Sequence, residues 1–157
     1  MSKILAYGLC GALSLSMALY LAISASRTAF ADNSVAPVRL DRDKIAGLGL
    51  TAIPPDAYKD ILVSGQLNMR VATVFEGKQL RASIFESTPA KTSHRTRPTD
   101  ADEFVYVLSG KLILTEMNGT PQEYRPGDSL VLPAGYTGTW EMQGNYREIA
   151  VVMQKVR

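Results

Sequence analysis

Two stretches decide the fold: EFVYVLSG, residues 103–110, and GDSLVLPAG, residues 127–135. Each contains a short run of β-favouring residues, and each run ends at a turn that holds glycine, in the second case with proline as well. Short strands bounded by such turns are typical of all-β sandwiches and barrels rather than of alternating β-α-β units. The sequence therefore predicts an all-β domain around these residues.

The same pattern extends from about residue 60 to the C-terminus. Further β-favouring runs are ILVSG, MRVATVF, LRASIFES, KLILTEM, TWEMQ and YREIAVVMQ. The Asn118-Gly119 pair predicts a hairpin, because both central residues of a type I′ turn need φ > 0. Residues 88–102, TPAKTSHRTRPTDAD, are predicted to form a long polar loop. Such a protein has to hide its sheet edges, and a double-sheet jelly roll does so while enclosing an interior cavity.

The N-terminal 31 residues have the features of a secretory signal peptide. Lys3 is followed by an apolar run over residues 4–23 and by an Ala-Phe-Ala site at 29–31. The alternative is an uncleaved membrane anchor, because the run approaches the roughly 20 residues that span a bilayer. Either way, we expect the rest of the chain to be periplasmic or secreted. We expect a lead-in segment at 32–58, with at most one short helix, and one domain at 59–157.

Cysteine content and charge exclude several classes of function. The one cysteine, Cys10, follows Leu9 rather than the small residue that a lipid anchor needs. It lies in the export segment, so the exported part has no disulfide, cysteine metal site or cysteine nucleophile. The chain has 17 basic and 15 acidic residues, and removing Lys3 and Arg27 with the export segment leaves 15 of each. Such a balance gives no electrostatic basis for binding nucleic acid, and a membrane is a partner only if the N-terminal segment is retained.

The two central stretches resemble the motifs of the cupin superfamily, and most of all its small branch of ureidoglycine aminohydrolase-like and ethanolamine-utilisation cupins. Glu103, six residues and Gly110 match the end of the first cupin motif. Gly127, five residues and Pro-Ala-Gly at 133–135 match the second. The resemblance covers about residues 83–152. It implies a single double-stranded β-helix, the cupin jelly-roll barrel, and a chain that can form a homodimer.

The sequence departs from the cupin pattern at the metal ligands. Metal-binding cupins place His-x-His three or four residues before the glutamate, where residues 96–99, TRPT, contain no histidine. A third histidine belongs three residues after the glycine of the second motif, and Gly138 stands there. Glu103 is the one ligand that remains of the four. One carboxylate with at most one imidazole cannot supply the three protein ligands of a catalytic zinc or iron site, so we expect no cofactor and no tightly bound transition metal.

Strand periodicity predicts what lines the interior instead. With Glu103 pointing inward, as the resemblance implies, alternate residues of its strand share its face (Val105, Val107) and the residues between them face outward (Phe104, Tyr106, Leu108). On the strand that begins at Gly138, the same rule points Trp140 and Met142 inward. The predicted cavity is apolar and aromatic, with a single acid near its mouth.

These residues predict a pocket for a small molecule. A rigid aromatic ring beside a carboxylate can hold a small polar ligand, such as a sugar-like, amino-acid-derived or amine compound. Glycine at 138 also clears the room that a histidine side chain would fill. The candidate ligand-binding residues are Glu103, Trp140, Met142, Arg97 and His94. If the protein is an enzyme, Glu103 is the candidate catalytic residue, because a carboxylic acid in an apolar barrel tends to hold its proton.

Each candidate has a structural alternative. Trp140 can simply fill the core, Glu103 can pair with Arg95 or Arg97, and His94, with its polar neighbours, is expected to be an exposed loop residue. The protein as a whole has two alternatives to ligand binding. One is a hydrolase or isomerase acting on a small nitrogen-containing or sugar-like substrate. The other is a structural dimer that uses the apolar run IAVVM, residues 149–153, as its interface.

Overall fold

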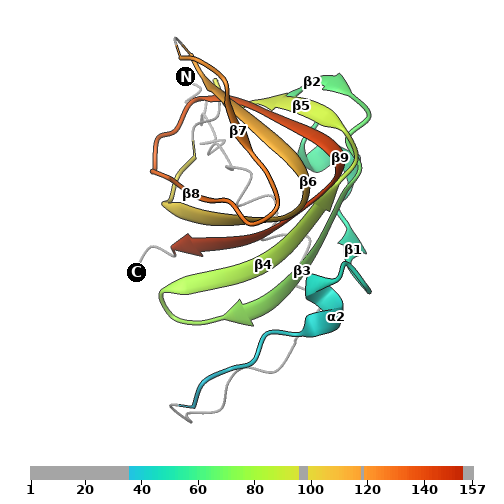
Figure 1. Ribbon diagram of the computed structural model, residues 1–157, viewed down its shortest axis with the longest axis vertical. Helices are drawn as coiled ribbons and strands as arrows, with labels where there is room; N and C mark the ends of the chain where they lie inside the picture. The colour runs from blue at the N-terminus through green and yellow to red at the C-terminus, as the bar shows by residue number, and fades with distance from the viewer. Residues whose placement is uncertain (1–35, 96–98, 118, 154–157) are drawn as a thin grey trace, which may run out of the picture.

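The computed structural model describes residues 36–95, 99–117 and 119–153, which form a curled β-structure (Figure 1). The strands are β1 Thr51–Ala52, β2 Leu62–Gly65, β3 Met69–Glu76, β4 Leu80–Ser87, β5 Ala90–Ser93, β6 Glu103–Glu116, β7 Gln122–Tyr124, β8 Ser129–Leu132 and β9 Gly138–Met153. The helical segments are α2 Arg42–Ile45 and the 3₁₀ turn η1 Pro55–Ala57. All strand pairings among these residues are antiparallel, so the predicted all-β class is confirmed.

The predicted export segment lies outside the described residues, and so does Arg97. In the parts of the chain that the structure describes, no helix has both the length and the apolar character needed to cross a membrane.

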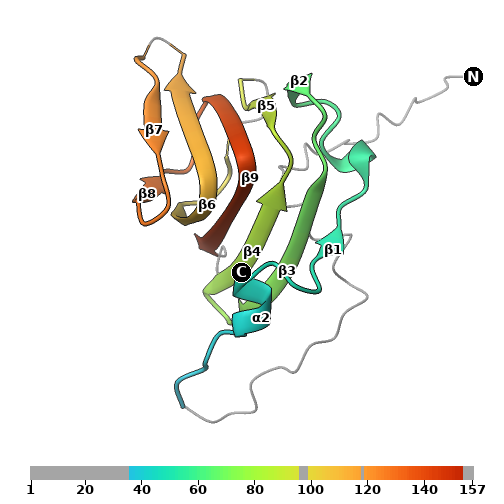
Figure 2. The ribbon, with the colours of Figure 1, turned by 45° about the vertical axis from the view of Figure 1, so that its right-hand side comes forward.

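Strands β6 and β9 form the frame of the barrel. They pair with each other from Glu103 opposite Val152 to Glu116 opposite Gly138, with register shifts near the middle of β6. The first part of β6 also pairs with β8 and the later part with β7. Strand β9 pairs first with β5 and then with β4. The bend in the two strands thus turns one continuous ladder into two sheets that face each other (Figures 1 and 2).

The sequence predicts four separate strands in this frame, and the structure joins them in pairs. The run 103–109 and all but the last residue of the run 111–117 belong to β6, and the runs that begin at 139 and 146 lie in β9 as far as Met153. Gly110 (φ 70°) and Gly144 (φ 69°) lie where the strands bend. This left-handed conformation is readily available to glycine alone, and it lets the chain turn sharply without ending the ladder.

The long polar loop predicted for residues 88–102 is wrong in its first part, because Ala90–Ser93 forms strand β5 between β2 and β9. Ala90 and Thr92 are buried, whereas Lys91 and Ser93, which alternate with them, are partly exposed. The segment therefore follows the two-residue period of a half-buried strand. Its inward residues are a small one and a polar one, so the alternation does not appear as apolar against polar in the sequence.

The hairpin predicted at Asn118-Gly119 is confirmed by the pairing of β6 with β7, from Leu114 opposite Gln122 to Leu112 opposite Tyr124. The geometry of the predicted type I′ turn depends on Asn118, which lies outside the described residues, so it stays a prediction. The Gly119 N–H donates to the carbonyl of Glu116 at 3.3 Å.

The interior is filled from both sheets. Its buried cluster consists of Ile53, Tyr58, Ile61, Leu67, Val71, Ala90, Val105, Val107, Leu112, Leu114, Leu132, Trp140, Met142 and Tyr146. The predicted alternation along β6 is confirmed: Val105 and Val107 are fully buried, whereas Phe104 and Tyr106 are 41% and 37% exposed. The inward orientation predicted for Trp140 and Met142 is confirmed by their place in the cluster.

The lead-in segment packs on the outside of the sheet that contains β3, β4 and the second part of β9. Its helix α2 begins after Asp41, whose carboxylate accepts the N–H groups of Asp43 and Lys44 at 2.8 and 3.3 Å. Strand β1 then pairs with β3 at its free edge (Figure 2). Gly47 lies so close to Arg147 of β9 that a Cβ there would collide with the guanidinium.

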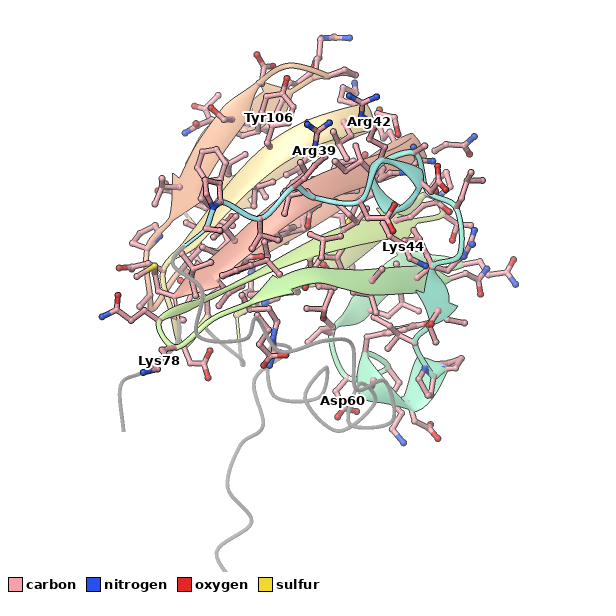
Figure 3. All side chains as sticks on the ribbon, turned by 90° about the horizontal axis from the view of Figure 1, so that it is seen from below. Arg39, Arg42, Lys44, Asp60, Lys78 and Tyr106 are labelled. Carbon is pink, nitrogen blue, oxygen red and sulfur yellow. The ribbon has the colours of Figure 1, made fainter. Side chains whose placement is uncertain are left out.

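Figure 3 shows the lead-in from below, where Arg39 and Arg42 lie on the same side of the barrel as Tyr106. Ile84, on the outer face of β4 opposite Ile149, is fully buried although it is not part of the interior cluster. Ile84 therefore belongs to a second buried layer, which lies on the outer face of the sheet.

The Arg147→Met variant is expected to lower the free energy of unfolding by about 1–3 kcal/mol. The Arg147 guanidinium donates twice to Glu86, at 2.7 and 3.0 Å, and Glu86 also accepts from Arg70 at 3.0 Å. Glu86 and Arg147 are about four-fifths buried, so water replaces these bonds poorly. Urea unfolding followed by tryptophan fluorescence measures the change.

The matched control is Arg125→Met, which removes an ion pair with Glu123 whose partners are 67% and 46% exposed. Its effect should stay below about 0.5 kcal/mol. Equal effects of the two variants would contradict the larger contribution expected from the buried Arg147–Glu86 pair.

Candidate functional site

Glu103 begins β6 on the inner face of the barrel and is partly buried. It shares this face with Val105, which is fully buried. Burial raises the pKa of Glu103 to about 7. None of the ion pairs among the described residues involves Glu103, and Arg95 is therefore not its partner. The alternative partner, Arg97, lies outside the described residues.

A second carboxyl, Glu148, also points into the barrel, and it was not predicted. It lies on β9 opposite Val107 and is 5% exposed. The Tyr146 hydroxyl donates a hydrogen bond to its Oε2. Burial, and to a smaller extent the charge of Glu103, raise the pKa of Glu148 to about 8, although the hydrogen bond from Tyr146 opposes the shift. Burial and the Glu148 charge also raise the pKa of Tyr146.

The signal for Glu148 was present in the sequence as a two-residue period. Tyr146, Glu148 and Ala150 alternate with Arg147 and Ile149. The apolar run at residues 149–153 follows directly and makes this period hard to recognise in the sequence. The pairing of β9 between β4 and β6 settles the faces, because Ala150 opposite Val105 is fully buried.

The expectation of an exposed His94 is wrong, because the residue is 5% exposed. Its N–H donates to the carbonyl of Gly138 at 2.8 Å, which continues the pairing of β5 with β9 for one more residue. Its ring lies against Trp140, with 5.7 Å between ring centroids and 47° between planes. Position 94 has the same parity as Ala90 and Thr92, so strand alternation buries it despite its polar neighbours.

Several buried polar atoms make no hydrogen bond within the described part of the chain. They include the hydroxyls of Thr73, Ser83 and Ser87 and the indole N–H of Trp140. Thr73 lies opposite Ser83, and Ser83 lies opposite Ala150. Strand parity places these hydroxyls on the same inner face as Phe85, which packs against the interior cluster. A buried hydroxyl or N–H without a partner costs about 1–3 kcal/mol, so such atoms are rare unless something else satisfies them.

The residues present do not fit the metal site of the resembling family. Gly138, at the position of the third histidine, is buried, and a Cβ there would collide with the Tyr136 hydroxyl and lie 2.6 Å from the Thr115 carbonyl. The space expected to be cleared by glycine is therefore filled by Tyr136, which is a correction to the sequence prediction. No group of three or more His, Cys, Asp or Glu side chains suited to a metal ion exists within residues 36–95, 99–117 and 119–153. That the protein holds no tightly bound transition metal stays a prediction.

A shallow depression of about 380 Å³ lies beside Tyr136, lined by Glu116, Met117, Gly119, Tyr136 and Thr137. Burial and the charge of Glu116 raise the pKa of Tyr136 to about 12. Asp102, next to Glu103 in the chain, accepts a hydrogen bond from the Ala134 N–H at 2.8 Å. The Thr99 hydroxyl accepts one from the Tyr136 N–H at 3.1 Å. The start of β6 and the Tyr136 turn therefore meet at the same end of the barrel.

Comparison with known proteins agrees with this architecture. Residues 74–149 match the family described as the EutQ-like cupin domain. A crystal structure of a protein of unknown function from Pseudomonas syringae pv. tomato is similar with a TM-score of 0.59 and 29% identity over 72% of this chain, which spans 46% of that protein. The EutQ protein of Clostridium difficile is similar in fold, with a TM-score of 0.53 and 14% identity over 78% of this chain and 97% of that one.

No curated protein sequence matches this chain. The family match spans the two motifs at 103–110 and 127–135, and the solved structures share the curled antiparallel ladder in which those motifs lie. The chain belongs to the cupin superfamily.

Proposed function

We propose that this protein is an exported cupin that binds a small polar molecule inside its barrel. The observation that carries the proposal is the set of buried polar groups on the inner face. Two carboxyls, Glu103 and Glu148, lie there with hydroxyls that have no partner among the described residues. A polar ligand would supply the missing hydrogen bonds, and their energy would then contribute to binding instead of opposing folding.

Trp140 and Met142 would form the apolar wall of this site. Both are buried in the interior cluster, and the buried indole N–H makes no hydrogen bond with the described residues. This arrangement, an apolar surface with a few polar groups that fix orientation, is typical of small-molecule sites. Packing alone explains the burial of Trp140, but it leaves the indole N–H and the inner hydroxyls unsatisfied.

The test is a screen of small polar metabolites with tryptophan fluorescence and thermal melting as readouts. Trp140 is the one tryptophan of the chain, so its emission reports on the barrel interior alone. A ligand is expected to change this emission and to raise the melting temperature, and Glu103→Gln is expected to weaken its binding by about tenfold.

The control variant is Glu123→Gln, which changes an exposed carboxylate of β7 that pairs with Lys111 and Arg125. It should leave binding unchanged. A complete screen in which neither readout responds to any compound would contradict the proposal.

An enzymatic role is the second candidate, and the raised pKa of Glu103 favours it. A carboxyl with a pKa of about 7 can give up and take back a proton near neutral pH, as a general acid or base must. In this case the substrate is a small nitrogen-containing or sugar-like molecule, and Glu103→Gln abolishes turnover as well as weakening binding. A structural dimer is less well supported, because both edges of the second part of β9 already pair, with β4 and with β6.

A further inference from the structure

Trp140 lies close to one open end of the barrel. In its row of the ladder it lies opposite Leu114 and Thr92, and all three side chains are buried. In the next row Gly138 lies opposite Glu116, which is exposed and lines the shallow depression beside Tyr136. The surface of the protein is therefore one row away from the indole at this end.

The side chain of Tyr136 covers this last row. Its hydroxyl lies so close to Gly138 that a Cβ there would collide with it, and its ring packs against the interior cluster. The residue is nevertheless partly exposed and lines the depression of about 380 Å³. The Tyr136 ring therefore lies between the depression and the interior, in a place that is free because residue 138 has no side chain.

No hydrogen bond holds this side chain in the closed position. The Tyr136 hydroxyl is buried and makes no hydrogen bond with any residue that the structure describes. A hydroxyl in this state is unfavourable, because water would satisfy it at the surface. The backbone, in contrast, is held at both polar groups: the Tyr136 N–H donates to the Thr99 hydroxyl at 3.1 Å, and the Tyr136 carbonyl accepts the Thr99 N–H at 3.2 Å. The side chain can therefore move while the turn stays in place.

We propose that Tyr136 is the gate of the barrel: its ring closes the interior at Gly138, and its rotation into the depression admits a small molecule to the site beside Trp140. The proposal rests on the proposed function and adds the way into its site. A change of χ1 moves the ring from one staggered position to another without moving the backbone.

The depression suits the open position of the ring. Its volume of about 380 Å³ lies in the range of small-molecule sites and exceeds that of one phenol ring. Met117, which is 53% exposed and lines the depression, offers the ring an apolar contact there. The hydroxyl would reach water at the same time, which offsets the contacts that the ring loses in the interior.

The experiment measures how easily acrylamide quenches the fluorescence of Trp140, and it needs no knowledge of the ligand. Tyr136→Phe keeps the ring and removes the hydroxyl without a partner, so it should favour the closed position. The bimolecular quenching constant is expected to fall by about fivefold, and the melting temperature is expected to rise. Tyr136→Ala removes the ring and should raise the quenching constant severalfold above that of the wild type.

Tyr124→Phe is the matched control. Tyr124 also packs against the interior cluster, but its hydroxyl already donates to Gln122 at 2.8 Å at an exposed position. Its removal should leave the quenching of Trp140 unchanged. Thermal melting checks that each variant is folded, and Tyr136→Phe tests the proposal even if Tyr136→Ala does not fold.

If Tyr136→Phe is quenched as readily as the wild type, the gate is overturned, whatever the metabolite screen finds. An unchanged quenching constant in folded Tyr136→Ala also overturns it, because the indole is then reached from elsewhere. If both variants respond as expected and the screen finds no ligand, Tyr136 closes the barrel as stated and the proposed function alone is contradicted.

Discussion

At pH 8, Glu148→Gln is expected to raise the free energy of unfolding by on the order of 2–4 kcal/mol. Glu148 is 5% exposed, and burial raises its pKa from an ordinary value of 4.5 to about 8. Between these two pH values the folded protein keeps a proton that the unfolded chain releases. Stability is therefore highest below about pH 4.5 with respect to this group and falls as the pH rises toward 8. Glutamine stays neutral and still accepts the hydrogen bond from Tyr146.

The measurement is the urea midpoint of the wild type and of Glu148→Gln from about pH 5 to 8. The wild type should lose stability over this range and the variant should lose much less. Glu103, with a pKa of about 7, contributes a smaller slope of the same sign, because its side chain keeps more contact with solvent. Glu141→Gln serves as the control and should follow the wild type. Parallel curves for wild type and Glu148→Gln would contradict the buried position of this carboxyl.

Gly110→Ala is expected to destabilise the protein by about 3 kcal/mol or more, and it is the second large effect. Gly110 has a φ of 70°, and a Cβ there would lie 2.7 Å from the carbonyl of Gln143 and 2.7 Å from the Cα of Tyr146. Both contacts are with backbone of β9, which cannot move without opening the ladder at the bend. Thermal and urea unfolding measure the loss.

Gly127→Ala separates the steric effect from the conformational one. Gly127 also has a positive φ, 98°, but a Cβ there would meet nothing within 4 Å. Gly127→Ala is expected to lower the free energy of unfolding by only about 1–2 kcal/mol, because alanine disfavours a positive φ. If the two variants lose equal stability, the close approach of β6 and β9 at the bend is not what Gly110 provides.

Much of the fold could be predicted from the sequence, because its signals are local. The first motif, from Glu103 to Gly110, and the second, from Gly127 to Gly135, predicted the barrel correctly. The two-residue alternation predicted correctly that Val105 and Trp140 face the interior. The long frame strands could not be predicted as single units. Gly110 and Gly144 look like ordinary turn residues, and only pairing across the barrel makes them bends within continuous strands.

The candidate site was predicted less completely, for two physical reasons. Apolar residues are the usual sign of an inward-facing position, but Glu148 and the inward residues of β5 are polar or small. Their burial follows the two-residue period and does not show as an apolar pattern. The space at Gly138 depends on a neighbour in the chain, Tyr136, whose side-chain direction is set by the turn and not by the strand. Polar inward residues are the features that a hydrophobic pattern conceals, and they carry the proposed function.

A crystal structure of the purified protein, at a resolution that places ordered water and small ligands, tests the central claim most directly. The account predicts non-protein density within hydrogen-bonding distance of Glu103, Glu148 and the Ser83 hydroxyl. An interior closed by side chains that satisfy these groups among themselves would contradict it, and so would a metal ion coordinated there.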